Sequence, residues 1–278
     1  MATPTKTEAL YQKDSDLHTH TSPLTSLTPL SSLPSTAQAL FKTPPGEPFI
    51  LTTPSTIFHA QGGGQPSDTG TMTLKGNEQE GGTFVVHQVR KVEPTILHLG
   101  TFEPPDKRFG GAEGAEAEMQ VVQRIDSEAR LLHSRLHTGG HALGLAINLL
   151  KQEGVLPSDL RDGKASHYPN AASVEFSGLI PGDKKSAIQE KVDELVSRDL
   201  EVGILFWSEE RAGEKCIGGI GGAAVSGEDV RVVDIGGLGC YPCGGTHVRR
   251  LGEVGRVVVR GVKRQRGVSR VGYDVLER

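Results

Sequence analysis

The sequence predicts an α+β protein with two domains, and three observations carry that prediction. Short apolar runs that suit β-strands are scattered along the whole chain. Two longer segments in the second half repeat apolar residues at helical spacing. The 278 residues are enough for one large or two modest domains, and 36 glycines indicate many turns. Strands mixed with two long helices are typical of α+β folds.

The first half is expected to be strand-rich. Residues 21–56 are rich in Ser, Thr and Pro, which suits either a long flexible loop or a set of edge strands. Residues 61–70 form a glycine-dense turn, and no helical pattern follows it, so it is not a phosphate-binding loop. Strands are predicted at 83–89 and 95–99. The stretch 109–118 is interpreted as a linker, which places a domain boundary near residue 120 and divides the chain into 1–120 and 121–278.

The second half contains the two helices. The first is predicted over 127–151, with Asp126 as its N-cap. The second is predicted over 184–200, after a Pro-Gly-Asp turn. Their apolar stripes are Leu132, Leu136, Leu143, Ile147 and Leu150 in the first helix and Ile188, Val192, Leu195 and Val196 in the second. Strands are predicted at 173–176, 204–207, 230–235, 254–259 and 271–276.

Composition excludes several classes of protein. No apolar run reaches the roughly 18 residues that a membrane span needs, so no membrane association is expected. Three cysteines do not make a disulfide scaffold. The odd count, without a secretory signal, points to a reducing compartment, and we expect the cytoplasm. The net charge of −4 argues against a surface that binds nucleic acid all over, and no DNA partner is expected.

Two histidines stand four residues apart on the first predicted helix. His137 and His141 therefore lie on one face, as two ligands of one metal ion require, although ordinary core histidines are the alternative. His133 shares this face and either extends the cluster or faces solvent. Gly139 and Gly140 lie between the pair, and each costs a helix up to about 1 kcal/mol relative to Ala. They predict a close approach by a ligand or a backbone, or else a break in the helix.

A second pair of potential ligands lies in a glycine-rich turn near the C-terminal end. Cys243 and His247 add one thiolate and one imidazole, which completes an N₃S donor set suited to Zn²⁺. Cys240 complicates this assignment, because Cys240 and Cys243 also form a C-x-x-C that suits redox chemistry or another zinc site. Cys216 is isolated and is interpreted as a small buried residue.

Residues 249–278 are locally basic, with eight Arg and one Lys against two Glu and one Asp. This cluster suits contacts with phosphates, and a solvated strand face is the alternative. Its candidate contact residues are Arg249, Arg250, Arg260, Lys263, Arg264, Arg266 and Arg270.

The motifs together resemble a known family. The H-x-x-x-H of residues 137–141, followed about a hundred residues later by the C-G-G-T-H-V of 243–248, resembles the editing domain of alanyl-tRNA synthetases. It is also similar to the free-standing alanyl-tRNA editing proteins of the AlaX type. The F-H-A-Q-G-G-G-Q-P-S-D-T-G of residues 58–70 resembles the glycine-rich motif of the family's first, barrel-like domain. The similarity extends over roughly residues 45–278.

This resemblance implies a function. It implies hydrolysis in trans of mischarged tRNA(Ala), with seryl-tRNA(Ala) as the expected substrate and glycyl-tRNA(Ala) as a second one. It implies one zinc ion per chain held by His137, His141, Cys243 and His247, an N-terminal β-barrel-like domain, and contact with the aminoacylated acceptor end of tRNA. Candidate catalytic residues are Thr138 and Thr246. Candidate contacts with substrate or tRNA are Gly62, Gly63, Gly64, Gln65, Lys263, Arg264, Arg266 and Arg270.

Three alternatives stay open at this point. The editing domain of threonyl-tRNA synthetases is similar and would act on seryl-tRNA(Thr), although the glycine-rich motif favours the alanyl type. A catalytically inert, zinc-stabilised RNA-binding module would use the basic stretch equally well. The third alternative is a structural protein without a metal. The oligomeric state does not follow from the sequence.

Overall fold

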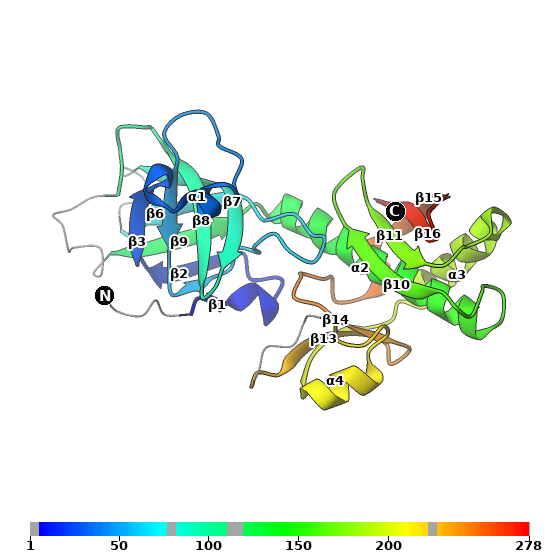
Figure 1. Cartoon of the computed structure of the whole chain (residues 1–278). Coiled ribbons are helices and arrows are strands. Elements are labelled where there is room, and N and C mark those ends of the chain that lie inside the picture. The colour runs from blue at the N-terminus through cyan, green and yellow to red at the C-terminus, as the bar shows by residue number, and fades with distance from the viewer. Residues whose placement is uncertain (1–5, 77–81, 110–118, 222–226, 278) are drawn as a thin grey trace. The chain divides into compact units, whose positions relative to one another are not determined.

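The computed structural model describes residues 6–76, 82–109, 119–221 and 227–277 (Figure 1). The chain divides into two compact units. Unit 1 comprises residues 1–62 and 66–130, and unit 2 comprises residues 63–65 and 131–278. The division falls later than the boundary expected near residue 120, because the strand Gln120–Ile125 pairs with strands of unit 1. Of the linker expected at 109–118, residues 110–118 lie outside the described residues.

Unit 1 is built on a seven-stranded antiparallel sheet with the order β2-β9-β6-β7-β8-β4-β3. The predicted strands at 83–89 and 95–99 are confirmed within the two longest strands, β7 and β8. The seven strands are β2 (Thr19–Pro23), β3 (Ser26–Pro29), β4 (Phe49–Thr52), β6 (Gly70–Leu74), β7 (Thr83–Val92), β8 (Thr95–Glu103) and β9 (Gln120–Ile125).

The Ser/Thr/Pro-rich segment carries both edges of this sheet. Strand β2 pairs only with β9 and β3 only with β4 among the described strands, so the edge-strand interpretation is confirmed. Pro23 and Pro29 fit there, because an edge strand tolerates a residue without an N–H. The same segment contains the short helix α1 (Ser35–Gln38), and β5 (Ser55–Thr56) pairs in parallel with β1 (Glu8–Ala9). The sheet is curled, and its closure into a barrel stays a prediction (Figure 1).

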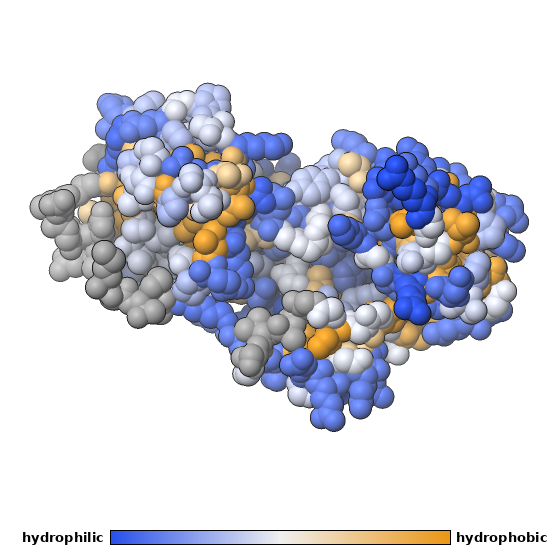
Figure 2. Space-filling model, in the orientation of Figure 1, coloured by the Kyte–Doolittle hydropathy of each residue, from blue (hydrophilic) through white to orange (hydrophobic). Residues whose placement is uncertain are grey.

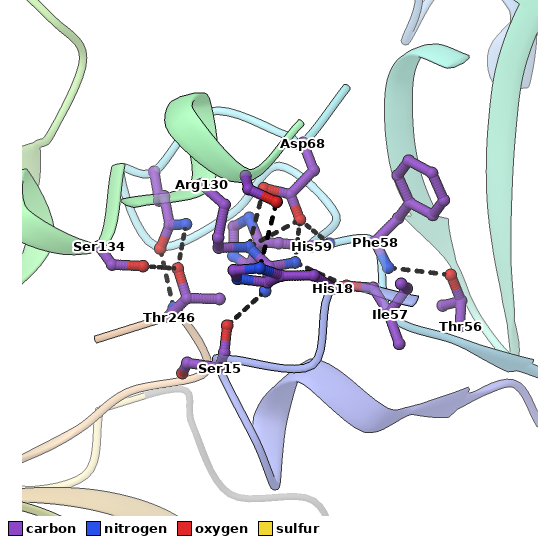
Figure 3. A network of polar contacts seen from close by, with 12 residues as sticks. Ser15, His18, Thr56, Ile57, Phe58, His59, Asp68, Arg130, Ser134 and Thr246 are labelled. Carbon is purple, nitrogen blue, oxygen red and sulfur yellow. Dashed lines mark hydrogen bonds and ion pairs between the residues drawn. The ribbon is translucent and has the colours of Figure 1, made fainter. Parts of the chain in front are cut away.

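A buried ion pair secures the flanks of the glycine-rich motif within unit 1. The guanidinium of Arg130 bonds the carboxylate of Asp68, and both side chains are almost fully buried (Figure 3). Asp68 also makes two hydrogen bonds with His59. Its Oδ2 accepts from the backbone N–H of His59 at 2.6 Å, and its own N–H donates to the His59 carbonyl at 3.1 Å. Arg130 also donates to the carbonyl of Ile57 at 2.6 Å. The two ends of the segment 59–68 are therefore held together.

Unit 2 contains the long helix α2 (Ser127–Gln152), whose first residues lie in unit 1. Asp126 is its N-cap as predicted, because its carboxylate accepts from the N–H of Ala129 at 3.0 Å. The helix is continuous through Gly139 and Gly140. Leu136, Leu143, Ile147 and Leu150 of the predicted stripe are buried, whereas Leu132 is 38% exposed and does not belong to the core.

A four-stranded antiparallel sheet and α3 (Lys185–Ser197) accompany α2 in the core of unit 2. The sheet has the order β10-β11-β16-β15 and consists of β10 (Arg161–Ser166), β11 (Ser173–Ser177), β16 (Val268–Leu276) and β15 (Arg256–Gln265). Helix α3 packs on β15, where the Gln189 side chain donates to the Val257 carbonyl and accepts from the Val259 N–H, both at 2.8 Å. All four residues of its predicted stripe are buried.

A smaller antiparallel sheet has the order β12-β13-β14. It consists of β12 (Val202–Trp207), β13 (Val230–Ile235) and β14 (Cys240–Pro242), and the short helix α4 (Glu209–Lys215) follows β12. The α+β class is therefore confirmed. Among the described residues, no helix has the length and apolarity needed to cross a membrane.

Candidate metal centre

Four potential metal ligands converge in unit 2. His137 and His141 come from adjacent turns of α2, and Cys243 and His247 come from the turn after β14. One ligand atom from each of these residues lies within 4.8 Å of the others. The Sγ atom of Cys243 is 3.3 Å from the Nε2 atoms of His137 and His247. The structure thus brings together both pairs that the spacing singled out, and His133 is not part of the cluster.

The donor set fits a metal ion. Three imidazoles and one thiolate are suited to tetrahedral Zn²⁺. The Nδ1 atom of His141 is buried and has no hydrogen-bond partner among the described residues, which is unusual for a protein interior unless a ligand supplies the partner. Burial, followed by the charges of His167 and Arg231, lowers the pKa of His141 to about 3, so its imidazole is neutral and has a lone pair for a metal.

Gln65 fixes the protonation of His137. The Oε1 atom of Gln65 accepts from the backbone N–H of Thr246 at 3.0 Å and lies 2.7 Å from Nδ1 of His137. An oxygen cannot donate, so Nδ1 of His137 carries the proton and donates it to Gln65. Its Nε2 atom therefore presents a lone pair towards Cys243, as metal binding requires. No motif spacing signals this contact, because the two residues are 72 positions apart.

Both candidate catalytic threonines take part in the hydrogen bonds behind the ligands. Thr138 Oγ1 lies 3.1 Å from Nδ1 of His247 and accepts from the N–H of Val248 at 3.2 Å. Thr246 Oγ1 accepts from Gln65 Nε2 at 2.8 Å and lies 2.8 Å from Ser134 Oγ (Figure 3). Both side chains are fully buried. A direct catalytic role for either threonine stays a prediction.

The surroundings of Cys243 act on its ionisation in opposite directions. Burial raises the pKa of the thiol, whereas the positive charge of Arg231 and the N–H of Gly245, 3.4 Å from Sγ, lower it. The Arg231 side chain is buried and donates to the backbone carbonyl of Cys243. A bound cation would complete the stabilisation of the thiolate.

Glycines let the ring systems approach their neighbours closely. A Cβ atom on Gly245 would lie 2.2 Å from Cε1 of His137, and one on Gly140 would lie 2.4 Å from Cε1 of His167. A Cβ on Gly139 would meet Val275 at 3.0 Å. Glycine is therefore required at the two helix positions for different reasons. Gly140 makes room for an imidazole, and Gly139 allows close packing on the sheet.

His167 belongs to the same region and was not predicted. Its ring stacks on that of His137, with centroids 4.2 Å apart and planes 26° apart. Its Nδ1 atom is 2.7 Å from the hydroxyl of Tyr273, which donates to the carbonyl of Leu136 at 2.8 Å. Burial lowers the pKa of His167 to about 4. A single histidine in a polar stretch has no spacing signal that could have identified it.

The glycine-rich motif and Cys240 are not part of the four-residue metal cluster. Within unit 2, the carbonyl of Gly64 accepts from the N–H of His167 at 2.8 Å, and Gly63 has an exposed backbone with a φ of +56°. Gly62 belongs to unit 1. Cys240 is not in the metal cluster: its buried sulfur lies 3.7 Å from that of Cys216, and burial raises its pKa to about 12.

Five of the seven basic residues with predicted phosphate contacts lie on the β15–β16 hairpin, whereas Arg249 and Arg250 precede it in the chain. Lys263, Arg264 and Arg266 are exposed and form no ion pair with any residue that the structure describes, whereas Arg270 pairs with Glu175 at 2.5 Å. Arg250 and Arg260 pair with Asp199 and Asp274. In the part of unit 2 that carries this hairpin, strongly hydrophilic residues lie beside hydrophobic ones (Figure 2).

Comparisons with known proteins place these residues in a family context. Residues 230–271, which include Cys243 and His247, match the family described as the threonyl and alanyl tRNA synthetase second additional domain.

Individual relatives align with a much longer part of this chain than the family match does. The alanine–tRNA ligase of Caldivirga maquilingensis is 34% identical over 224 residues, which cover 78% of this chain and 23% of the ligase. That of Methanopyrus kandleri is 31% identical over 223 residues, covering 78% of this chain and 22% of the ligase. The alanyl-tRNA editing protein AlaX-L of Pyrococcus horikoshii is 28% identical over 221 residues, covering 78% of this chain and 49% of that protein. The chain thus spans less than a quarter of these ligases and about half of the editing protein.

Proposed function

This chain is related to the alanyl-tRNA synthetases and to the AlaX-type alanyl-tRNA editing proteins, and from that premise we propose that it edits tRNA(Ala). The proposed reaction is hydrolysis of the ester bond that joins a wrong amino acid to tRNA(Ala). Seryl-tRNA(Ala) is the proposed substrate, and the enzyme is an aminoacyl-tRNA deacylase. A place in the cytoplasm, where tRNA is charged, is part of the same proposal.

The observation that carries this proposal is the convergence of the two ligand pairs. Cys243 and His247 lie inside the segment that matches the tRNA synthetase domain family, and His137 and His141 meet them from α2. We propose that these four side chains hold one Zn²⁺ per chain. When bound, zinc can polarise the ester carbonyl or a water molecule. Four protein ligands are typical of a closed zinc site, so substrate positioning is the alternative role.

The residues of the chain have separate parts in this proposal. Gln65 donates to Thr246 and accepts from His137, so it keeps the ligand Nε2 of His137 directed at the cluster. The Thr138 hydroxyl lies 3.1 Å from Nδ1 of His247, and by accepting its proton in a hydrogen bond it would direct Nε2 of His247 at the cluster. Hydrolysis of an ester develops negative charge on the carbonyl oxygen, and buried N–H and O–H groups stabilise such charge well. Thr138 and Thr246 are the proposed residues for that contact.

The proposed nucleic-acid partner is the aminoacylated acceptor end of tRNA. Lys263, Arg264 and Arg266 present unpaired positive charge on one hairpin, which suits the phosphates of the tRNA backbone. The remaining proposed contacts with substrate or tRNA are Gly62, Gly63, Gly64, Gln65 and Arg270.

A deacylation assay tests the proposed function. The purified protein is incubated with seryl-, glycyl- and alanyl-tRNA(Ala) and with seryl-tRNA(Thr), before and after treatment with a chelator. We expect fastest release of serine from tRNA(Ala) and little release of alanine. The Cys243→Ala variant should be inactive, and Cys240→Ala is the matched control. Preference for seryl-tRNA(Thr) would favour the threonyl type, and tRNA binding without any release would favour an inert RNA-binding module.

A further inference from the structure

A second polar cluster lies beside the metal cluster in unit 2. It consists of Asn148 from α2, Asp162 from β10 and Tyr241 from β14, arranged around Gly144 of α2. The ring of Tyr241 packs edge-on against that of His141, with centroids 4.9 Å apart. This contact makes the second cluster continuous with the proposed metal site.

Asp162 has acceptor capacity that the protein does not use. The side chain of Asn148 donates to its Oδ1 at 3.1 Å and to its Oδ2 at 3.0 Å, and it also donates to the Gly144 carbonyl at 3.0 Å. No residue within the described ranges forms an ion pair with Asp162. Burial raises the pKa of Asp162, and it is opposed by the dipolar Asn148 amide, by the charge of Lys151 and by the Asp162 N–H. Lys151 donates to the Leu160 carbonyl and forms no ion pair with Asp162, so the carboxylate is still costly to bury.

Tyr241 adds an oxygen without a well-formed hydrogen bond. Its hydroxyl is buried and meets no described residue with full hydrogen-bond geometry, although the Asn148 amide and the Asp162 carboxylate both act on it. Most buried hydroxyl groups in proteins are hydrogen-bonded, so an exception calls for a ligand or a water molecule. The hydroxyl without a well-formed hydrogen bond and the carboxylate without an ion pair together indicate a binding site.

Gly144 keeps the space between these two oxygens open. A Cβ atom at this position would lie 3.1 Å from the Tyr241 hydroxyl and 3.8 Å from Oδ1 of Asp162. Gly144 is in the middle of a helix, where Gly is less favourable than Ala. Its φ is not positive, so the backbone does not require glycine there, and room for a ligand is a sufficient reason.

The chemistry of this cluster selects a small cation with several N–H groups. The cluster offers a negative carboxylate and a neutral hydroxyl oxygen, both as acceptors. An aminoacyl ester carries such a cation, its α-ammonium group, one carbon away from the carbonyl that is hydrolysed. We propose that Asp162 and Tyr241 bind the α-ammonium group of the aminoacyl ester. This inference rests on the proposed function and names the group that holds the amino-acid end of its substrate.

The consequence is a requirement for a free amino group. Any α-amino acid satisfies this contact, so the cluster orients the ester and does not distinguish serine from alanine. An N-acetylated aminoacyl ester has no positive charge and is bulkier, so it should bind poorly. This requirement separates the cluster from residues that read the amino-acid side chain.

The experiment compares free-amine and N-acetylated probes. Binding of the non-hydrolysable 3′-serylamino-adenosine and of its N-acetyl derivative is measured by calorimetry with the zinc-loaded protein. We expect the wild type to prefer the free amine by about 10–100-fold, the usual effect of a charge-assisted hydrogen bond. Asp162→Asn should lose this preference to within about threefold. Asp159→Asn, an exposed aspartate in the loop before β10, is the matched control and should keep it.

A second variant guards against loss of folding. Gly144→Ala favours the helix and inserts a methyl group between the two oxygens, so it should keep its thermal stability and still bind the free-amine probe more weakly. A wild-type preference in Asp162→Asn, or a wild-type affinity for the free-amine probe in Gly144→Ala, would overturn the inference. Failure of the proposed function is separate: it would appear as an absence of deacylation in the wild type, while the binding ratio would still report on this cluster.

Discussion

The side chain of Gln65 accepts a hydrogen bond of 2.7 Å from Nδ1 of His137, and so joins the glycine-rich motif to the H-x-x-x-H helix. The same oxygen accepts from the N–H of Thr246, which lies in the C-G-G-T-H-V turn. One carboxamide thus connects all three motifs that the sequence singled out. Such outer hydrogen bonds orient metal ligands and commonly change metal affinity by 10–100-fold.

Loss of the Gln65 carboxamide should weaken metal binding. Gln65→Leu removes the acceptor for His137 and leaves the Thr246 N–H buried without a partner, so we expect the zinc affinity to fall by about 10–100-fold. Gln65→Glu retains an acceptor and should lose less. Competition with a chromophoric chelator measures both. Gln61→Leu, at an exposed glutamine of the same segment, is the control. Equal affinities for Gln65→Leu and Gln61→Leu would contradict the prediction.

Removal of a ligand should abolish stoichiometric zinc. We expect about one zinc per chain in the wild type, because four compatible ligands converge. Cys243→Ala and His141→Ala should each lose most of it. Cys240→Ala should retain it, because its sulfur faces Cys216. Elemental analysis of the purified variants measures the content, and undiminished zinc in both ligand variants would exclude this assignment.

Local periodicity predicted the positions of the helices well. Where an element ends at a different residue than predicted, a residue with positive φ explains the difference. Helix α3 was expected to extend to residue 200 but ends at Ser197, because Asp199 adopts a positive φ of +47° that terminates the helix. Strand β15 was expected over 254–259 but runs to Gln265, beyond the end of its apolar pattern. It continues because Arg266 and Gly267, both at positive φ, form a tight turn that pairs it with β16.

The candidate ligands could be predicted because their spacing is local, i and i+4 in both pairs. The groups around them could not. His167, Tyr241 and Asp162 are single polar residues on three different strands or loops, and only the fold brings them beside α2. Gly140 was recognised as costly, but the imidazole that requires it is 27 positions away.

The glycine-rich motif provides a matched pair of substitutions. Gly63 and Gly64 both have positive φ values, +56° and +81°, so Ala at either site should cost about 1 kcal/mol. A Cβ on Gly63 meets no described atom within 4 Å, whereas one on Gly64 would lie 2.4 Å from the carbonyl oxygen of Ala165. Gly64→Ala should therefore lose clearly more stability in denaturant unfolding. Equal losses would contradict this packing.

The buried His98 should make unit 1 sensitive to acid. Its ring bonds Thr56 at 2.8 Å and the Leu51 carbonyl at 2.9 Å, and burial lowers its pKa from 6.5 to about 4. Between these values the unfolded chain binds a proton that the folded chain does not, so stability is full above pH 6.5 and falls as the pH drops towards 4. The loss is roughly 3 kcal/mol.

Titration of His98 can be followed directly by nuclear magnetic resonance. We expect its ring protons to show no titration down to about pH 5 in the folded protein. In His98→Gln, the free energy of unfolding should depend less steeply on pH between 6.5 and 4. A midpoint near 6.5 for His98 in the folded state would contradict the prediction.

The exposed basic residues of the β15–β16 hairpin should set the salt dependence of tRNA binding. Lys263 lies opposite Arg270 in the hairpin, and Arg266 occupies the turn. Arg270 is paired with Glu175, so Lys263, Arg264 and Arg266 are the charges left available for phosphates. Each phosphate contact adds about 0.7–0.9 to the slope of log affinity against log salt concentration, so three contacts contribute about 2–3.

The variant that tests this should keep the hairpin intact. Lys263→Gln and Arg264→Gln remove charge from the strand, and Arg266→Asn removes it while Asn-Gly still favours the positive φ values of the turn. We expect weaker tRNA binding and a salt slope reduced by about 2–3, with the preference for seryl over alanyl esters unchanged. The control variant removes the same charge elsewhere in unit 2. It combines Lys185→Gln in α3, Arg198→Gln at the C-terminal end of α3 and Lys215→Gln in α4. Loss of the seryl preference in the hairpin variant, with its salt slope intact, would place these residues at the amino-acid site instead.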